Sequence, residues 1–440
     1  MNLSRSDLSL GSARITHKPV PTTALVHRFE WSACFLSLTS LIFSNFTPQL
    51  AASGFLAGSA LFGLIRPTRA VRALTADWLP WLFIALAFLS ISWSPVPDLS
   101  LRYAVELLST VAAAMVMARG VDPTSLLSAL MCAFIAVDIV GLYVDRYALN
   151  AGAWAMIGAF GSKNSFSAAQ AIFFLTSLWV LLSAKQRLLM RLLALLGVFG
   201  CPFLLVAGRS VDAVAPLIVA TSLSLLAYAT VSFPPRARLL SLSAGAALLA
   251  CIFIIAFVFS DTIIGELLTI TGKDMTLTGR TYLWERAAEL MDQSPLLGRG
   301  YGAFWFQGNP YAEEIWREFG LIDRGGFNFH NLWYEQGVQL GYIGIAVALL
   351  TLLIVSFRVT RWTVRFPTAE SFFFLSYVML IDMRSLLETE IFSQFTYTYV
   401  IFIAAGLYGR YAPLIATQSL QQQASASTSK GDHLLEAVKS

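Results

Sequence analysis

Most of this chain consists of apolar runs long enough, or nearly long enough, to cross a lipid bilayer as helices. Crossing the hydrocarbon layer takes about 20 apolar residues. Hydrophobic residues make up 57% of the 440 positions and charged residues only 13%, whereas a soluble domain has roughly 25% charged residues. The sequence therefore predicts an all-α, polytopic membrane protein with about 12 transmembrane helices. We expect these helices near residues 31–47, 50–65, 78–93, 103–118, 124–144, 165–183, 190–207, 211–232, 239–260, 337–357, 369–386 and 390–408.

The distribution of Lys and Arg between the short loops predicts the orientation of the chain, because loops rich in these residues stay in the cytoplasm. One set of alternate loops carries Arg66, Arg69, Arg72, Arg119, Lys185, Arg187, Arg191, Arg236, Arg238, Arg358, Arg361 and Arg365. The other set carries only Arg102, Arg146, Lys163, Arg209 and Arg384. Both termini are therefore expected in the cytoplasm, with a multi-pass chain in a bacterial inner membrane.

The chain then divides into five parts. We expect a cytoplasmic N-terminal tail (1–30), a first block of membrane helices (31–260), a large periplasmic loop (261–336), three closing membrane helices (337–408) and a disordered cytoplasmic tail (409–440). The N-terminal tail is polar and basic and has no cleavage site after a short apolar core, so it is not a cleaved signal peptide.

Composition also excludes several functional classes. The formal net charge of +4 is spread over many loops, so no basic patch points to nucleic acid. The four cysteines, Cys34, Cys132, Cys201 and Cys251, lie in or beside apolar runs without a neighbouring Cys or His ligand. We read them as small apolar side chains, and we expect no metal and no cofactor.

The large outer loop concentrates the polar groups that could do chemistry. A helical pattern over residues 280–293 places Leu283, Ala287, Leu290 and Met291 on one face, so this helix should lie along the membrane or the bundle. Arg280 is expected at its start, where free N–H groups favour an anion. The alternative is that Arg280 only pairs with a nearby acid.

Further along the loop, glycines alternate with aromatic residues in GRGYG, residues 298–302. The pattern is a weak phosphate-loop signal, because no strand precedes it and no GK[ST] follows. A sugar platform and a simple tight turn suit it as well.

His330 is the only histidine outside the two ends of the chain. Asn331 is expected to cap the following helix, which would place His330 at the bilayer surface, and Tyr334, four residues on, would share its face. A neutral imidazole there could act as a general base. A single histidine is often only structural, and no second histidine stands nearby to complete a metal site.

Two further polar spots belong to the same side of the membrane. Lys163 and Asn164 stand at the start of one predicted helix, and Arg209 and Asp212 stand at a break that we interpret as a tight hairpin. Glu106 and Asp138 are the ionisable residues expected within the membrane. Such groups often mark a transport path, and the alternative is that these two are packing partners.

Four segments together resemble a known family. They are GAFGSKNSF (158–166), AGRS (207–210), TGRTYLWERAAELMDQSPLLGRGYGAFW (278–305) and FHNLWYEQGVQLGYIG (329–344). In this order they resemble the O-antigen ligase and Wzy-type polysaccharide polymerase superfamily, and its ExoQ-like exopolysaccharide branch in particular. The resemblance covers residues from about 80 to 408.

The resemblance implies a membrane glycosyltransferase that acts on an undecaprenyl-diphosphate-linked oligosaccharide at the outer face of the inner membrane. Arg280 and Arg209 would hold the diphosphate, and His330 would activate the acceptor hydroxyl. Membrane lipid, chain-length regulators and flippases are the partners to consider. We also include Lys163, Asn164, Asn331, Tyr334 and Arg324 as substrate-binding residues.

Three functions remain open from the sequence. A polymerase would join lipid-linked repeat units by metal-independent, inverting transfer. A ligase would transfer a glycan to a lipid or protein acceptor. A transporter or flippase would place charged residues along a path at the membrane midplane, whereas here they gather in the outer loop.

Overall fold

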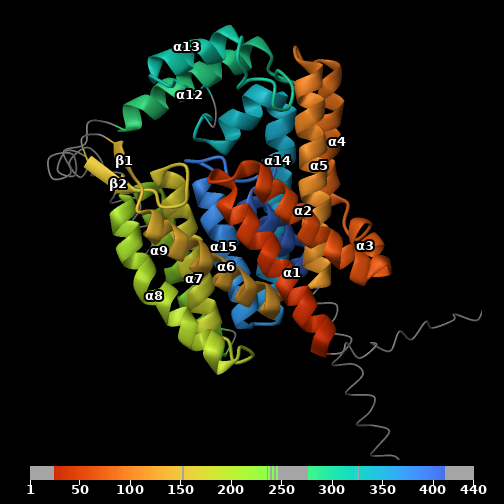
Figure 1. Cartoon of the computed structure of the whole chain (residues 1–440), viewed down its shortest axis with the longest axis vertical. Coiled ribbons are helices and arrows are strands. Elements are labelled where there is room, and N and C mark those ends of the chain that lie inside the picture. The colour runs from red at the N-terminus through yellow and green to blue at the C-terminus, as the bar shows by residue number, and fades with distance from the viewer. Residues whose placement is uncertain are drawn as a thin grey trace, which may run out of the picture.

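The chain folds into a bundle of long helices, drawn in Figure 1. The computed structural model describes residues 24–150, 153–234, 276–322, 324 and 327–411, together with a few positions between 236 and 245. The first block contains α1 (Ala24–Ile42), α2 (Pro48–Ile65), α3 (Pro67–Leu74), α4 (Leu79–Leu89), α5 (Pro97–Gly120), α6 (Pro123–Val144), α7 (Lys163–Leu182), α8 (Leu188–Gly208) and α9 (Val211–Ala229). The second contains α12 (Thr276–Gln293), α13 (Pro310–Glu318), α14 (Leu332–Arg365), α15 (Ala369–Arg384) and a last helix over residues 397–411.

The predicted class is confirmed: this is an all-α, polytopic membrane protein. Eleven of the twelve predicted spans coincide with helices, and the twelfth, residues 239–260, falls almost wholly outside the described residues. Within the described part, seven helices are long and apolar enough to cross a membrane, or eight if α3 and the segment Leu79–Ser92, bent by 67°, form one broken span. One addition was not predicted, a short antiparallel hairpin of β1 (Tyr147–Asn150) and β2 (Ala153–Met156).

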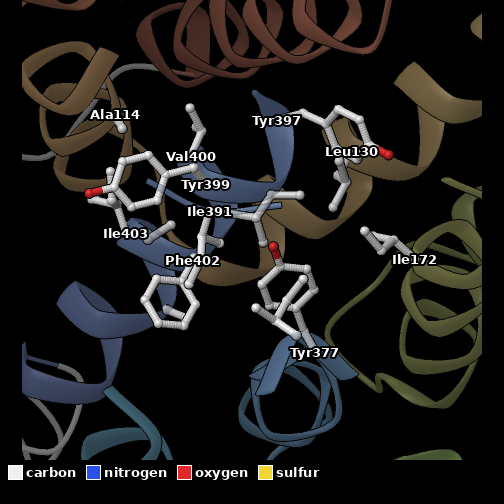
Figure 2. Packing of buried hydrophobic residues seen from close by; sticks show 14 of the residues in the cluster. Ala114, Leu130, Ile172, Tyr377, Ile391, Tyr397, Tyr399, Val400, Phe402 and Ile403 are labelled. Atoms are coloured by element: carbon white, nitrogen blue, oxygen red, sulfur yellow. The ribbon is translucent and has the colours of Figure 1, made fainter. Parts of the chain in front are cut away.

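The last helix forms the centre of the bundle. Residues 397–409 are all buried, which is what an apolar surface on every side of a helix requires. Figure 2 shows its side chains among residues from four other helices: Ala114 of α5, Leu130 of α6, Ile172 of α7 and Tyr377 of α15. The last segment of the described chain is therefore enclosed by helices that precede it in the sequence.

A second, smaller core lies in the outer layer, where α12 and α13 cover one end of the bundle (Figure 1). The predicted apolar face of α12 is confirmed, since all four of its residues are buried there and α12 packs on α14. Phe304, Trp316 and Phe329 fill the rest of this core. The outer segment is thus a folded layer with its own apolar interior.

The long helix α14 is broken at Gly341, whose φ of 64° and ψ of −163° are not helical. Residues on both sides of the break bond to the loop 295–300 instead of to their own helix. The four hydrogen bonds run from Arg299 N to Val338 O (3.0 Å), Gly300 N to Gln339 O (2.7 Å), Tyr342 N to Pro295 O (2.7 Å) and Ile343 N to Leu296 O (3.3 Å). The loop therefore satisfies both the donors and the acceptors that the break leaves free, as a low-dielectric setting demands.

This contact also explains the glycines of GRGYG. Gly298 has φ of 64°, and a Cβ there would lie 2.5 Å from the backbone of Gln339. Gly302 donates its N–H to the Gln339 side chain at 2.8 Å. Of the three interpretations, the tight turn is the one that the structure supports, and the turn docks on the break in α14.

The close approach of loop and helix predicts that Gly341→Ala destabilises the protein. A Cβ at Gly341 would meet the carbonyl carbon of Leu296 at 2.3 Å, and the backbone conformation is unfavourable for Ala, so the cost should exceed ~2 kcal/mol. Thermal unfolding in detergent should show a clearly lower midpoint. Gly200→Ala in α8 is the matched control, because a Cβ there meets nothing within 4 Å, and its midpoint should be unchanged or slightly higher. Equal midpoints for the two variants would contradict this account of the break.

Candidate functional site

Three of the predicted site residues, His330, Arg280 and Asn164, contact one carboxylate, that of Glu388. Its Oε1 accepts from Arg280 Nη2 at 2.8 Å and from Asn164 Nδ2 at 2.8 Å. Its Oε2 lies 3.0 Å from His330 Nδ1. Glu388 is only 8% exposed, so these contacts are shielded from water.

Each member of this cluster comes from a different element. Arg280 is on α12, Asn164 is in the first turn of α7, His330 precedes α14, and Glu388 follows α15. The last two segments are joined directly, because Leu332 N donates to Ser385 O at 2.9 Å and Asn331 Nδ2 to Leu386 O at 3.0 Å. These two bonds hold His330 beside Glu388.

Local structure fixes the backbone of His330. Asn331 caps α14 as predicted, with its side chain accepting from Trp333 N at 2.9 Å and Tyr334 N at 3.3 Å. His330 itself has φ of 48°, a left-handed conformation that needs support from its surroundings. Its own N–H donates to Asn328 Oδ1 at 2.7 Å, which supplies part of that support.

The preceding residue, Phe329, is clamped through its backbone. Its N–H donates to the buried carboxylate of Glu335 at 3.0 Å, and its carbonyl accepts from Trp284 Nε1 at 3.0 Å. Trp305 and Gln339 also donate to Glu335, at 3.1 and 2.6 Å. The residue before the histidine is therefore anchored in the outer core, so the imidazole has little freedom to drift.

A second set of charged residues, centred on Asp212, lies next to Arg280. Asp212, in the first turn of α9, is 3.6 Å from Arg280 Nη2 and accepts from Ser210, which also donates to Asn164 Oδ1 at 3.0 Å. Arg384 is 1% exposed and donates to Asp212 O at 2.9 Å and to Glu390 at 2.6 Å. Each buried charge is thus paired, as burial requires.

These charges determine the ionisation of Glu388. Burial alone would raise the pKa of this carboxyl. The hydrogen bond from His330 and the positive charges of His330, Arg384 and Arg280 outweigh burial and lower the pKa to about 2. Glu388 is therefore a carboxylate at physiological pH, and the ring nitrogen facing it, Nδ1 of His330, is the one that carries hydrogen. In the neutral ring, Nε2 is left as the proton acceptor.

The chain is similar to known proteins in two respects. A family model described as O-antigen ligase matches residues 214–349, which include Arg280 and His330. The chain is also 30% identical over 337 residues to the exopolysaccharide production protein ExoQ of Rhizobium meliloti (strain 1021), covering 74% of this chain and 76% of that protein. The chain belongs to the ExoQ-like ligase and polymerase family. The resemblance of the sequence motifs is thereby confirmed.

Among the predicted site residues, the structure joins His330, Arg280 and Asn164 through Glu388. Lys163 is beside Asn164 at the first position of α7, and Arg209 ends α8 in a left-handed conformation with φ of 49°, next to Ser210. The predicted break at this point is confirmed. Both helices that it separates pack on α7, and α9 also packs on α15.

Two other predicted substrate-binding residues make contacts elsewhere, and the predicted position of Arg280 at the start of its helix was wrong. Tyr334 stacks on Trp284 at 6.0 Å in the outer core, and Arg324 pairs with Glu313 at 3.3 Å; the structure brings neither into the described network around Glu388. Arg280 does not start its helix, because TLTG extends α12 back to Thr276. An anion at Arg280 would meet the guanidinium and not the free N–H groups of a helix end.

Sequence reasoning missed Glu388. The predicted spans 369–386 and 390–408 put it in a minimal turn, whereas α15 ends at Arg384 and the last helix starts at residue 397. The intervening segment is tied to the helices on both sides, since Glu390 pairs with Arg384 and its carbonyl accepts from Thr398 Oγ1. Two glutamates in RSLLETE between apolar runs were the available signal. Within the described residues, no group of three or more His, Cys, Asp or Glu is placed to hold a metal ion.

The depressed pKa of Glu388 predicts a specific pH dependence of stability. The free carboxyl titrates near 4.5 in the unfolded chain and near 2 in the folded protein. Its stabilisation is therefore complete above pH 4.5 and is lost as the pH falls through 2. Glu388→Gln should lower stability at neutral pH by on the order of 1–3 kcal/mol. Melting curves of both proteins should converge across this acid range, and a constant gap between them would contradict the assignment.

Proposed function

We propose that this protein polymerises undecaprenyl-diphosphate-linked oligosaccharide repeat units into exopolysaccharide. The observation that carries the proposal is the cluster in which one buried carboxylate holds a histidine and an arginine together, at the end of the bundle covered by α12 and α13. A base and a cation are the two groups that glycosyl transfer from a lipid diphosphate needs. The relationship to an exopolysaccharide production protein supports the choice of product.

The chemistry assigns one step to each group. His330 Nε2 takes the proton of the acceptor hydroxyl as its oxygen attacks the anomeric carbon of the donor. The bond from that carbon to the diphosphate breaks, and the electron pair leaves with the diphosphate. Arg280 neutralises the charge that develops there, helped by Arg209, because a guanidinium binds phosphate oxygens while keeping its proton. Direct displacement of this kind inverts the anomeric centre.

Glycan ligation is the second candidate, and the match of residues 214–349 to the O-antigen ligase model favours it. The same donor chemistry would serve, with a lipid or protein acceptor in place of a growing chain. A transporter has less support. Of the two predicted intramembrane acids, Asp138 bonds to Gln170 at 2.8 Å and Glu106 pairs with Arg102 at 2.9 Å, each within its own neighbourhood.

The remaining cellular assignments belong to the same proposal. We place the protein in the bacterial inner membrane with both termini in the cytoplasm and the site at the periplasmic face. There the donor arrives already activated on its lipid, since nucleotide sugars are absent. Lys163 and Asn164 would then line the approach of the donor to Arg280, and flippase and chain-length proteins are its expected partners.

Polysaccharide size analysis tests the proposal. In a deletion strain, His330→Ala and Arg280→Ala should each reduce long polymer by about 100-fold or more, with single repeat units accumulating on the lipid carrier. Polymer of normal length that stays on its carrier would support the ligase. Normal polymer on its normal acceptor would contradict both roles.

Arg286→Ala is the matched control. This arginine lies on the same helix as Arg280 but pairs with Glu289 and Glu314 at 2.7 and 2.6 Å on the exposed side of α12. Polymer length should stay near the wild-type value in this variant. A loss as large as that of Arg280→Ala would mean that the helix, and not the site, is being disturbed.

A further inference from the structure

The Glu388 carboxylate has a second consequence, because the two groups it holds have different tasks. One oxygen, Oε1, receives the Arg280 guanidinium, and the other, Oε2, faces His330 Nδ1. The donor diphosphate is an anion and would compete with this carboxylate for Arg280. The acceptor proton, once transferred, makes His330 a cation that the same carboxylate would stabilise.

The charges around Glu388 are nearly balanced before any substrate binds. Arg280 and Arg384 are the cations that lower its pKa together with His330. Asp212, Glu390 and Glu335 are acids from α9, from its own segment and from α14, and Lys163 is beside Asn164 on α7. The Arg280 charge is therefore already engaged by Glu388 at 2.8 Å and Asp212 at 3.6 Å. A diphosphate that binds here must share or replace these contacts.

We propose that Glu388 is a positioning residue whose carboxylate passes from Arg280 to His330 as the donor diphosphate binds. When Arg280 turns to the phosphate oxygens, Glu388 loses its closest cation. When His330 then takes the proton of the acceptor hydroxyl, the resulting imidazolium replaces the guanidinium as the charged partner of Glu388. The inference rests on the proposed function and adds to it. His330 becomes a stronger base only when the donor is in place, which limits hydrolysis of the donor by water.

The geometry allows this exchange without a change of fold. Both ion pairs of Arg280 run through Nη2, so a modest rotation of one side chain releases them. Asn164 holds Glu388 Oε1 at 2.8 Å, and Asn164 Oδ1 is in turn held by Ser210 at 3.0 Å. The carboxylate therefore stays in place, facing His330, after Arg280 has left.

The test uses the full-length protein in lipid nanodiscs and a readout that does not require glycosyl transfer. Diethyl pyrocarbonate modifies only the neutral imidazole, and mass spectrometry follows modification at His330. The measured quantity is the modification rate of His330 at about pH 8 divided by the rate at about pH 6. These two values lie on either side of the ordinary pKa of an imidazole. A ligand that only shields His330 lowers both rates by the same factor and leaves this ratio unchanged. Farnesyl diphosphate serves as the lipid diphosphate probe.

In the wild type, farnesyl diphosphate should raise this ratio by at least about threefold, because His330 then stays protonated to higher pH. In Glu388→Gln the ratio should be lower without the probe. Its response to the probe should be at most half that of the wild type, leaving only the direct effect of the diphosphate charge. Glu390→Gln, which removes a carboxylate of the same segment that binds Arg384, should keep the wild-type response.

Equal responses in the wild type and in Glu388→Gln would overturn the exchange, as would a wild type that does not respond. Either result leaves the proposed function standing if His330→Ala and Arg280→Ala still abolish long polymer. Normal polymer in those two variants would instead remove the proposed function, whatever the modification rates show. The two failures are therefore distinguishable.

Discussion

The break in α14 fixes the position of the outer layer. A helix interrupted at Gly341 leaves peptide groups without partners, and the loop 295–300 supplies them through four backbone hydrogen bonds. That loop follows α12 directly, so the docking fixes α12 against α14. Arg280 lies on α12 and His330 immediately precedes α14. The relative position of Arg280 and His330 thus depends on a main-chain contact remote from both.

The same region shows how buried acids and arginines hold one another in place. Glu388, Asp212 and Glu390 are all carboxylates, yet each is engaged by a buried arginine or a hydrogen-bond donor. Such pairing holds Arg280 and Arg384 in a defined orientation. Burial of an unpaired arginine would be far more costly. The acids therefore keep the two guanidinium groups in place.

Much of the fold could be predicted because it depends on local patterns. Apolar runs gave helices, the apolar face of α12 is the buried one, and Asn331 caps α14. The break at Gly341 escaped prediction because the apolar pattern continues across it. The hairpin of β1 and β2 escaped prediction because its strands are only four residues each.

The site was predicted in part for the same reason. His330, Arg280 and Asn164 stand out as polar residues at helix ends or in a polar loop. Glu388 does not, because its role depends on partners 58, 108 and 224 positions away. Tyr334 and Arg324 are equally polar in sequence, but the folded chain directs them to Trp284 and Glu313. The sequence thus suggested which polar groups were candidates, while the tertiary structure decided which of them meet.

The helix at the centre of the bundle is the last of the described elements to be synthesised. Residues 397–409 are enclosed on all sides, and the segment with Glu388 is carried between this helix and α15. During synthesis, α7, α9, α12 and the histidine segment emerge well before that carboxylate. A nascent chain therefore holds Arg280 and His330 without the group that joins them. The contacts that join Arg280, His330 and Asn164 through Glu388 can therefore form only after the segment between α15 and the last helix has been made.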